Sequence, residues 1–563
     1  MSTVNVVHTK ERLSGIVQLV GRRPNDVPKR RWESVLVFAF FTVAYSWFGY
    51  WVVVDLHVVG FETLDRLNRA LMVWHNDPAK LSAIGFDYPP LATLLITPLA
   101  VVRSFVTSMA AVPVASAIFA AITMVAFNTM MRRALVAGPL RYALLLALGC
   151  NPLLLLYATT GTRHFVWIAF VITALGSLFA WYITADVRWV LLAGISYSVA
   201  ALAGYSSLTL FVLSAIMVGA ILARLGADGV EVEGTVVGFT APTVYVVALW
   251  TVFNFILLWN PFAWITNSSD AAASGGLEMF SAVDLMKATG ELVLYGAPLA
   301  IVVLPMLIFS GLARGNPFAL WLGVMLGASI LTPALAVAFR LTDSPMLMRN
   351  ALPMLLIAVV GAIWLARSAE EGSTLVAGLT VVALVISIPW TLHAMKTYRY
   401  QNLEAPFAVA ITTGESQEGA ETLNGDKVGI VSEQAMAEYI RNNVTSDNSI
   451  LTDNAQTYAV MMLTGHPEWF FDRVDKSDGP WKEVARDPAG QVDYMLIDTM
   501  DNGDLLTKLY PDAAAGNDPQ LQAVYKTPRY VLVNVPANYS PNLVTTQDQI
   551  QGQPTTDQGS GGS

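Results

Sequence analysis

Residues 34–54 read SVLVFAFFTVAYSWFGYWVVV, and the next residue is Asp55. The run holds no charged side chain and has about the 20 residues that an α-helix needs to cross a bilayer. It follows the basic stretch Lys29-Arg30-Arg31, so the positive-inside rule places the N-terminal segment, residues 1–33, in the cytoplasm. The run is too long and starts too late for a cleavable signal peptide. It therefore predicts a spanning helix with Asp55 at its outer end.

Further apolar runs follow this first span. The stretch Leu91–Val102 is too short to cross and is interpreted as re-entrant or interfacial. The expected spans are 34–54, 108–131, 142–158, 165–183, 189–205, 207–223, 236–258, 292–311, 317–337, 345–366 and 373–393. The ends that this threading places in the cytoplasm carry Arg132, Arg133, Arg141, Arg188, Arg224, Arg314 and Arg367. About eleven spans result, and the odd count puts the C-terminal part outside the cell.

Charge divides the chain into two parts. Only 13% of the 563 residues are charged, against 54% hydrophobic residues, whereas a soluble domain has about 25% charged residues. Residues 1–398 carry a net charge of +4, and residues 399–563 carry −13. The acidic part argues against a nucleic-acid partner. The single cysteine, Cys150, excludes an intrachain disulfide and a cysteine-based metal site.

The C-terminal part alternates helical and strand-like patterns. Residues 433–442 and 454–463 have helical spacing, while 449–452, 494–497 and 530–533 are typical of short buried strands. The fold class is therefore a polytopic α-helical membrane protein with a C-terminal extracytoplasmic α/β domain. Its segments are a transmembrane domain at 34–398, with the first outer loop and its juxtamembrane helices at 55–108, a soluble domain at 399–540, and a disordered tail or linker at 541–563.

The first outer loop gathers acidic side chains and histidines. Asp55 is followed by His57, Asp65 and Asp87, and then by Tyr88. Asp55 is either an ordinary interfacial carboxylate or a group that accepts a proton from an incoming hydroxyl. The same loop leaves a divalent cation open, through oxygen or imidazole ligands. No strict metal motif is present and no cofactor is required by the sequence, so no residue is assigned to a metal.

Arginines lie on the outer loops, where the positive-inside rule disfavours them. Arg163 and His164 lie on one short loop, and Arg340 and Arg349 flank another. The planar guanidinium binds phosphate through two hydrogen bonds, so these residues are candidates for a lipid-phosphate site. The alternative is that they snorkel to lipid head groups.

With these residues placed, the chain resembles the GT-C superfamily of integral-membrane glycosyltransferases. It is most similar to the branch of protein mannosyltransferases, the aminoarabinose transferase of lipid A, and actinobacterial arabinofuranosyl- and mannosyltransferases. The resemblance rests on Asp55 directly after the first span, on Tyr88-Pro-Pro-Leu91, and on Arg349-Asn350-Ala-Leu-Pro353, which is similar to an Arg-Tyr-x-x-Pro motif. It covers most of residues 30–400.

The resemblance implies that Asp55 is the catalytic residue. It also implies that Arg163, His164, Arg349 and Arg340 hold the phosphate of a polyprenyl-phosphate-sugar donor. His57, Asp65, Asp87 and Tyr88 are expected to support the site or bind the acceptor. Three departures stand out. Leu56-His57 follows Asp55 where the family often has a second acid, Gly204-Tyr205-Ser206 replaces a common lysine, and Arg163-His164 replaces an Arg-Asp pattern.

The resulting hypothesis is a glycosyltransferase of the cytoplasmic (plasma) membrane, embedded in its lipids and working at the outer face. It would move arabinofuranose or mannose to a cell-envelope glycan or lipoglycan acceptor. The alternatives are a polymerase or ligase of lipid-linked glycans, and a transporter or flippase. Transporters place ionisable residues within spans near mid-membrane and show internal repeats, whereas here the spans are nearly free of charge.

Overall fold

The computed structural model describes residues 31–79, 81–85, 89–161, 163–262, 264, 281–339, 346–369, 372–420, 428–473, 478–500 and 504–540. The chain divides into two compact units. The first, Met1–Gly49 with Ser116–Gly414, is called the membrane unit here. The second, Tyr50–Ala115 with Glu415–Ser563, is called the loop–tail unit. Most of the segment expected at 1–33 and all of the expected tail at 541–563 lie outside the described residues.

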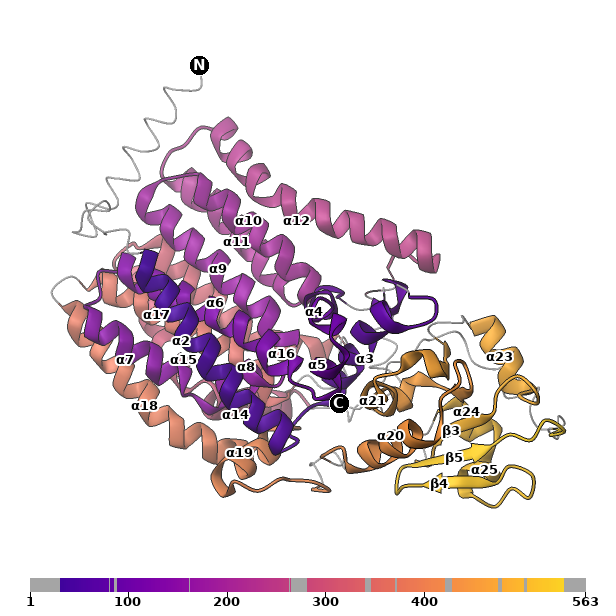
Figure 1. Cartoon of the computed structure of the whole chain (residues 1–563). Coiled ribbons are helices and arrows are strands. Elements are labelled where there is room, and N and C mark those ends of the chain that lie inside the picture. The colour runs from indigo at the N-terminus through magenta and orange to yellow at the C-terminus, as the bar shows by residue number, and fades with distance from the viewer. Residues whose placement is uncertain are drawn as a thin grey trace. The chain divides into compact units, whose positions relative to one another are not determined.

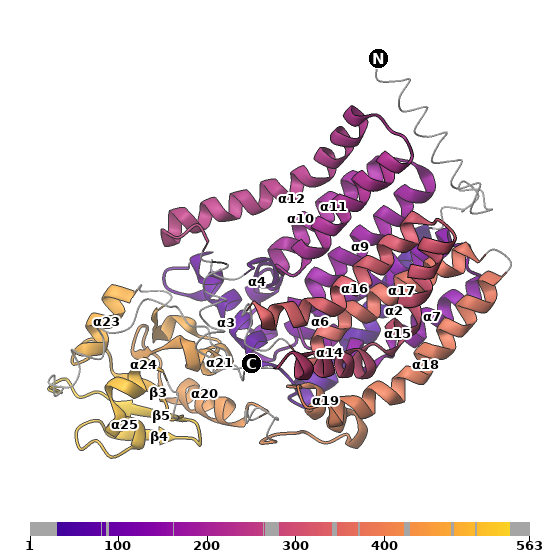
Figure 2. The ribbon, with the colours of Figure 1, turned by 180° about the vertical axis from the view of Figure 1, so that it is seen from behind.

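The membrane unit is a bundle of helices, as Figure 1 shows. They are α2 (Arg31–Tyr50), α6 (Ala111–Arg133), α7 (Gly138–Gly149), α8 (Pro152–Thr159), α9 (Arg163–Thr184), α10 (Arg188–Ala203), α11 (Ser207–Arg224), α12 (Gly229–Leu258), α14 (Ala282–Gly296), α15 (Pro298–Ala313), α16 (Pro317–Ala338), η4 (Met348–Asn350), α17 (Ala351–Ser368), α18 (Ser373–Thr397) and α19 (Glu404–Thr413). The long helix α12 lies along α10 and α11 in both views (Figures 1 and 2). The chain is thus a multi-pass membrane protein.

Two of the predicted spans are broken. The run 142–158 is two helices, α7 and α8, bent by 70°, and the run 292–311 falls across α14 and α15, bent by 103°. Prolines 152 and 298 open the second helix of each pair, because a proline lacks the N–H that would continue the preceding helix. Asn151 caps α8, since its side chain accepts hydrogen bonds from Leu153 N and Leu154 N. The apolar composition therefore predicted one span where the structure has two helices, each pair being separated at a proline.

The span count follows from these breaks. Eight helices of the described chain are long and apolar enough to cross a membrane, and counting each bent pair as one span gives up to ten. The predicted eleventh is α10, which has 16 residues and a length of about 24 Å, short of the roughly 30 Å hydrocarbon core. The expected arrangement of many spans is confirmed, and the predicted number of eleven depends on this one short helix.

The loop–tail unit begins where the first span ends. It contains the π-helix η1 (Trp51–Asp55), α3 (Phe61–His75), η2 (Leu81–Ile84), α4 (Leu91–Ile96), η3 (Leu99–Val101) and α5 (Arg103–Thr107). The short pieces α4, η3 and α5 pack against α3. Residues 91–102, expected to be re-entrant or interfacial, thus form two short helices and no single span.

The C-terminal part of this unit, residues 415–540, is called the tail from here on, and it contributes a mixed sheet with helices. Its elements are α20 (Val431–Asn443), β1 (Ile450–Thr452), α21 (Asn454–Thr464), η6 (Pro467–Trp469), β2 (Phe470–Phe471), α23 (Asp478–Arg486), β3 (Tyr494–Asp498), α24 (Leu505–Leu509), α25 (Pro511–Ala515), β4 (Ala523–Lys526) and β5 (Tyr530–Asn534). The strand order is β2-β1-β3-β5-β4. β1 pairs in parallel with β2 and β3, and β5 pairs antiparallel with β3 and β4. The predicted α/β class is confirmed, with all three expected strands present.

Side chains of the central strands alternate between two cores. Leu496 and Leu532 face a core formed with α3, α20 and α21, while Ile497 and Val531 face a second core formed with Trp481 and its neighbours. This alternation is the two-residue period of a strand whose two faces are both covered.

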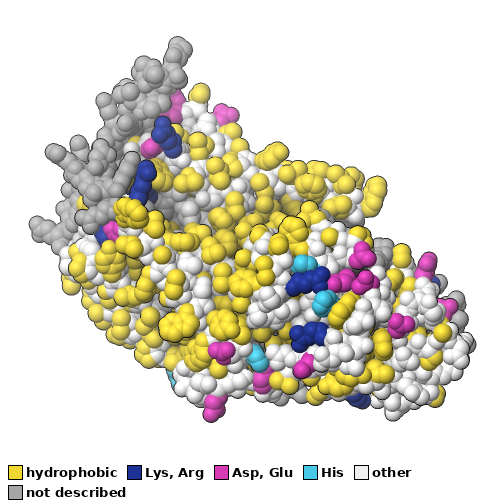
Figure 3. Space-filling model, viewed as in Figure 1, with side chains coloured by type: hydrophobic (Ala, Val, Ile, Leu, Met, Phe, Trp, Pro, Cys, Tyr) yellow, Lys and Arg dark blue, Asp and Glu magenta, His cyan; other side chains and the backbone are white. Residues whose placement is uncertain are grey.

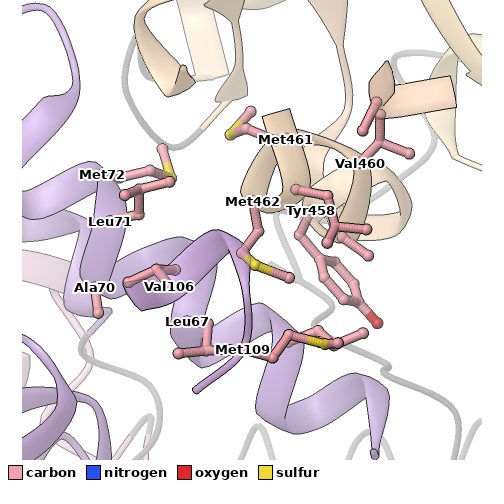
Figure 4. Close-up of a cluster of buried hydrophobic side chains, with 14 of the residues drawn as sticks. Leu67, Ala70, Leu71, Met72, Val106, Met109, Tyr458, Val460, Met461 and Met462 are labelled. Carbon is pink, nitrogen blue, oxygen red and sulfur yellow. The ribbon is translucent and has the colours of Figure 1, made fainter. Parts of the chain in front are cut away.

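The first core joins the first outer loop to the tail. Figure 4 shows Leu67, Ala70, Leu71 and Met72 of α3 and Val106 of α5 near a set of side chains from α21. That set is Tyr458, Val460, Met461 and Met462. The loop expected as part of the transmembrane domain therefore folds together with the tail.

Candidate functional site

Asp55 ends the π-helix that closes the first span. The helix Arg31–Asp55 is long and apolar enough to cross a membrane, and the Leu56 N–H donates to Trp51 O at 3.0 Å, five residues back. Single π turns of this kind often occur at functional sites. Asp55 is exposed, and among the described residues its carboxylate makes no hydrogen bond or ion pair. The carboxylate is thus open to an incoming group.

His57 is bound by a residue that sequence reasoning missed. Its Nδ1 lies 2.5 Å from Oε1 of Glu418, 361 positions along the chain. Both side chains keep about a fifth of their surface exposed, 21% and 23%. No local pattern marks Glu418, because a contact over this separation depends on the folding of the tail onto the loop.

The other loop residues divide into paired and undescribed ones. Asp65 forms an ion pair of 2.8 Å with Arg69, one turn further along α3. Asp87 and Tyr88 lie outside the described residues. Among the residues that the structure describes, no three Asp, Glu, His or Cys side chains come together as a metal site would require.

A second histidine of the loop serves the junction with the tail. Arg103 donates to His75 Nδ1 at 3.1 Å and, through Nη1, to Glu468 Oε1 at 2.8 Å. The same Nη1 lies 2.8 Å from His466 Nδ1. The pKa of Glu468 is lowered because its hydrogen bonds, from its own backbone and from Arg103, outweigh the opposing effect of its burial. The hydrogen bonds of Arg103 with His75, His466 and Glu468 therefore connect the loop to the tail.

The cationic residues lie on the membrane unit. Arg163 and His164 are the first residues of α9, and both are half-buried. The ring of His164 lies 6.3 Å from that of Tyr157 on α8. Tyr157 in turn donates to Glu404 Oε1 at 2.5 Å, and Glu404 is only 1% exposed. The buried carboxylate of Glu404 thus binds the tyrosine that lies beside His164. The sequence did not reveal this carboxylate.

Arg349 lies in η4, and the chain segment 398–404 connects it to the same region. The Met348 N–H donates to Tyr400 O at 3.1 Å, and Tyr398 Oη donates to Met346 O at 2.9 Å. Glu404 at the end of this segment binds Tyr157. One segment of seven residues therefore contacts η4, which carries Arg349, and α8, whose Tyr157 lies beside His164. Arg340 lies outside the described residues.

The charged side chains follow the division into units. In Figure 3 the visible face of the membrane unit is mostly hydrophobic, and charged and histidine side chains gather over the loop–tail unit. Asp55 and His57 belong to the loop–tail unit, and Arg163, His164 and Arg349 to the membrane unit.

No family model matches the chain, and no curated protein matches it in sequence. Solved structures do. The crystal structure of ArnT from Cupriavidus metallidurans bound to undecaprenyl phosphate aligns with a TM-score of 0.51 and 16% identity, over 88% of this chain and 97% of that one. The apo form aligns with a TM-score of 0.50 and 13% identity, over 89% and 98%. The chain has the fold of ArnT.

This likeness confirms, at the level of the fold, the resemblance to GT-C proteins that Asp55, Tyr88-Pro-Pro-Leu91 and Arg349 indicated. It extends over 88% of this chain and 97% of the ArnT chain. An oligosaccharyltransferase of Archaeoglobus fulgidus also aligns, at 9% identity over 84% of this chain and 70% of its own, but its TM-score of 0.42 is too low to support a conclusion about the fold. The branch to which the sequence resemblance pointed stays a prediction.

Proposed function

We propose that the protein is a glycosyltransferase that moves a sugar from a polyprenyl-phosphate donor to a cell-envelope glycan or lipoglycan. The observation that carries the proposal is the exposed Asp55 at the end of the first span, in a chain with the fold of ArnT. The bound lipid of the ArnT structure, undecaprenyl phosphate, supports a donor of the same chemical class. Arabinofuranose and mannose are the sugars proposed.

Asp55 would act as the general base. A hydroxyl oxygen of the acceptor attacks the anomeric carbon of the donor, and the bond from that carbon to the phosphate oxygen breaks. The hydroxyl proton goes to the Asp55 carboxylate, and polyprenyl phosphate leaves with the bonding electrons. Attack from the face opposite the leaving group inverts the anomeric centre. An exposed carboxylate is suited to this task because an incoming hydroxyl can approach within hydrogen-bond reach.

Arg163, Arg349 and His164 would stabilise the negative charge that develops on the phosphate, with Arg340 as a further ligand. Fixed cationic donors at a developing oxyanion are commonly the largest contribution to catalysis. Support comes from the segment 398–404, which contacts both η4 and α8. Through Tyr157, whose ring lies beside that of His164, this segment connects the surroundings of Arg349 and His164 within one unit.

The reaction would take place at the outer face of the plasma membrane. The distribution of arginines supports this orientation, since Arg132, Arg133, Arg188 and Arg224 lie at ends that the positive-inside rule assigns to the cytoplasm. The acidic tail and Asp55 then lie outside. A tag at residue 540 that is labelled only after cell lysis would contradict this orientation.

The test is a transfer assay with the purified full-length protein. Polyprenyl-phosphate arabinose and polyprenyl-phosphate mannose are offered in parallel with envelope acceptors, with and without a chelator, to test the open question of a divalent cation. Wild type is expected to consume one donor, and Asp55→Asn to lose at least roughly a hundred-fold in kcat, the scale of a lost general base. Asp447→Asn, an exposed aspartate of the same unit, is the matched control.

Three outcomes of this assay would contradict the proposal, and two of them would identify one of the alternative functions. Full transfer by Asp55→Asn would show the catalytic assignment to be wrong. Joining of already assembled lipid-linked glycans would identify a polymerase or ligase instead. Consumption of neither donor, together with substrate flux in vesicles, would identify a transporter.

A further inference from the structure

Glu418 reaches His57 from a segment that is held by several hydrogen bonds. Ser416 Oγ donates to Leu56 O at 3.2 Å, so the tail segment is bound to the residue directly after Asp55. The Gly419 N–H donates to Val428 O at 2.8 Å, which closes the segment on itself. Residues 416–418 thus bind the loop at two consecutive positions, 56 and 57.

The carboxylate of Glu418 has its own support. The Ile430 N–H lies within hydrogen-bond distance of both carboxylate oxygens, at 3.2 and 3.1 Å. Gly429 has φ +103°, a conformation that only glycine adopts readily, and a Cβ at this position would overlap the carboxylate. The backbone of residues 429–430 therefore lies directly against the Glu418 carboxylate and donates a hydrogen bond to it.

On the other side of the pair, the backbone of His57 is also constrained. His57 has φ +54°, an uncommon conformation for a non-glycine residue, and its carbonyl accepts from Val59 N at 3.1 Å. The Val58 N–H donates to Val52 O at 3.0 Å, which folds the loop back on the π-helix. Strained backbone of this kind persists only where its surroundings hold it, and the Glu418 contact is one of the holding groups.

We infer that Glu418 is a positioning residue: it fixes the ring of His57 and, through residues 56 and 57, the backbone directly after Asp55. A carboxylate that accepts from Nδ1–H selects one tautomer and leaves Nε2 as the lone-pair nitrogen of the neutral ring. This gives the tail a part in the candidate site. The inference rests on the proposed function.

The kinetic test compares Glu418→Gln, Glu418→Asp, His57→Ala and the double variant Glu418→Gln/His57→Ala in the transfer assay. Glu418→Gln is expected to lower kcat roughly ten- to a hundred-fold, the range found for groups that orient a reacting residue, with the donor KM unchanged. Glu418→Asp should recover part of the loss. The double variant should equal His57→Ala, because Glu418 acts through His57. Glu438→Gln, an exposed carboxylate on α20, is the control.

A second measurement needs no transferase activity. The rate at which diethyl pyrocarbonate modifies His57, followed by mass spectrometry of the full-length protein, is expected to rise several-fold in Glu418→Gln and in Gly429→Ala. An unchanged rate would show that the pair does not hold the ring, whether or not the protein transfers sugar. An active wild type with Glu418→Gln at full kcat, or with losses that add to those of His57→Ala, would also overturn the inference. Absence of transfer by wild type would instead count against the proposed function.

Discussion

Tyr157 donates a 2.5 Å hydrogen bond to Glu404, which lies 247 positions further along the chain. Glu404 also accepts from the Asn402 N–H at 2.7 Å, so its buried carboxylate is satisfied from two directions. The bond ties the helix α8 to the segment that follows the last span. Glu404 is therefore a structural acid of the membrane unit, and its partner Tyr157 lies beside His164.

We predict that Tyr157→Phe destabilises the protein by about 1–3 kcal/mol, because it leaves a buried carboxylate oxygen without its donor. The measurement is the free energy of unfolding or the thermal midpoint in detergent. Tyr142→Phe is the control, since Tyr142 is 44% exposed. Equal stability of the two variants would refute a structural role for the bond.

Arg349 provides a test of phosphate binding. Arg349→Gln is expected to raise the donor KM, and Arg349→Lys to restore only part of the affinity, because lysine keeps the charge but loses the two-pronged geometry. The donor KM in the transfer assay is the measurement. Arg188→Gln, at the start of α10, is a control at the end assigned to the cytoplasm, and a comparable effect of both changes would argue for general lipid interactions.

Two glycines of α14 make a matched pair. A Cβ at Gly296 would overlap the Cβ of Ala351 at the start of α17, whereas nothing lies within 4 Å of a Cβ at Gly290. Gly296→Ala should therefore lower the thermal midpoint, and Gly290→Ala should leave it unchanged or raise it, since alanine favours a helix by up to about 1 kcal/mol over glycine. The reverse order of the two midpoints would contradict the packing at this bend.

Met462 tests the core shared by the loop and the tail. The side chain is fully buried between α21 and its neighbours, so Met462→Ala should cost about 2–5 kcal/mol of stability. Met500→Ala, at a methionine 51% exposed, should cost little. Limited proteolysis of the Met462→Ala variant is expected to cleave the chain in both the loop and the tail. Cleavage confined to the tail would show that the two do not share one core.

Asp504 makes stability depend on pH. Burial, and after it the charge of Asp453, holds the pKa of Asp504 well above its ordinary value. The folded protein then binds a proton that the unfolded chain releases near pH 4, so this contribution is complete below about pH 4 and is lost as the pH rises through the folded pKa. The thermal midpoint of wild type relative to Asp504→Asn should therefore fall as the pH increases. A difference that stays constant from pH 4 to 8 would contradict this.

Much of the fold could be predicted from local sequence patterns. The apolar runs located the spans, because crossing a bilayer demands a length and composition that any window of sequence displays. The strands at 450–452, 494–498 and 530–534 were visible for a similar reason, as short apolar runs between turns. The same local patterns misread the run 292–311, where Pro298 starts a new helix at a 103° bend.

Asp55 could be selected from sequence because its position directly after an apolar run is a local property. Glu418 and Glu404 could not, since each is defined by a partner hundreds of residues away, His57 and Tyr157. By itself the sequence determined the membrane spans, the charge division and the α/β class of the tail, all of which depend on near neighbours. Only the tertiary structure decided that the first loop and the tail share one core and that an acid of the tail holds His57, because such contacts arise from packing between distant segments, and packing leaves no period in the sequence.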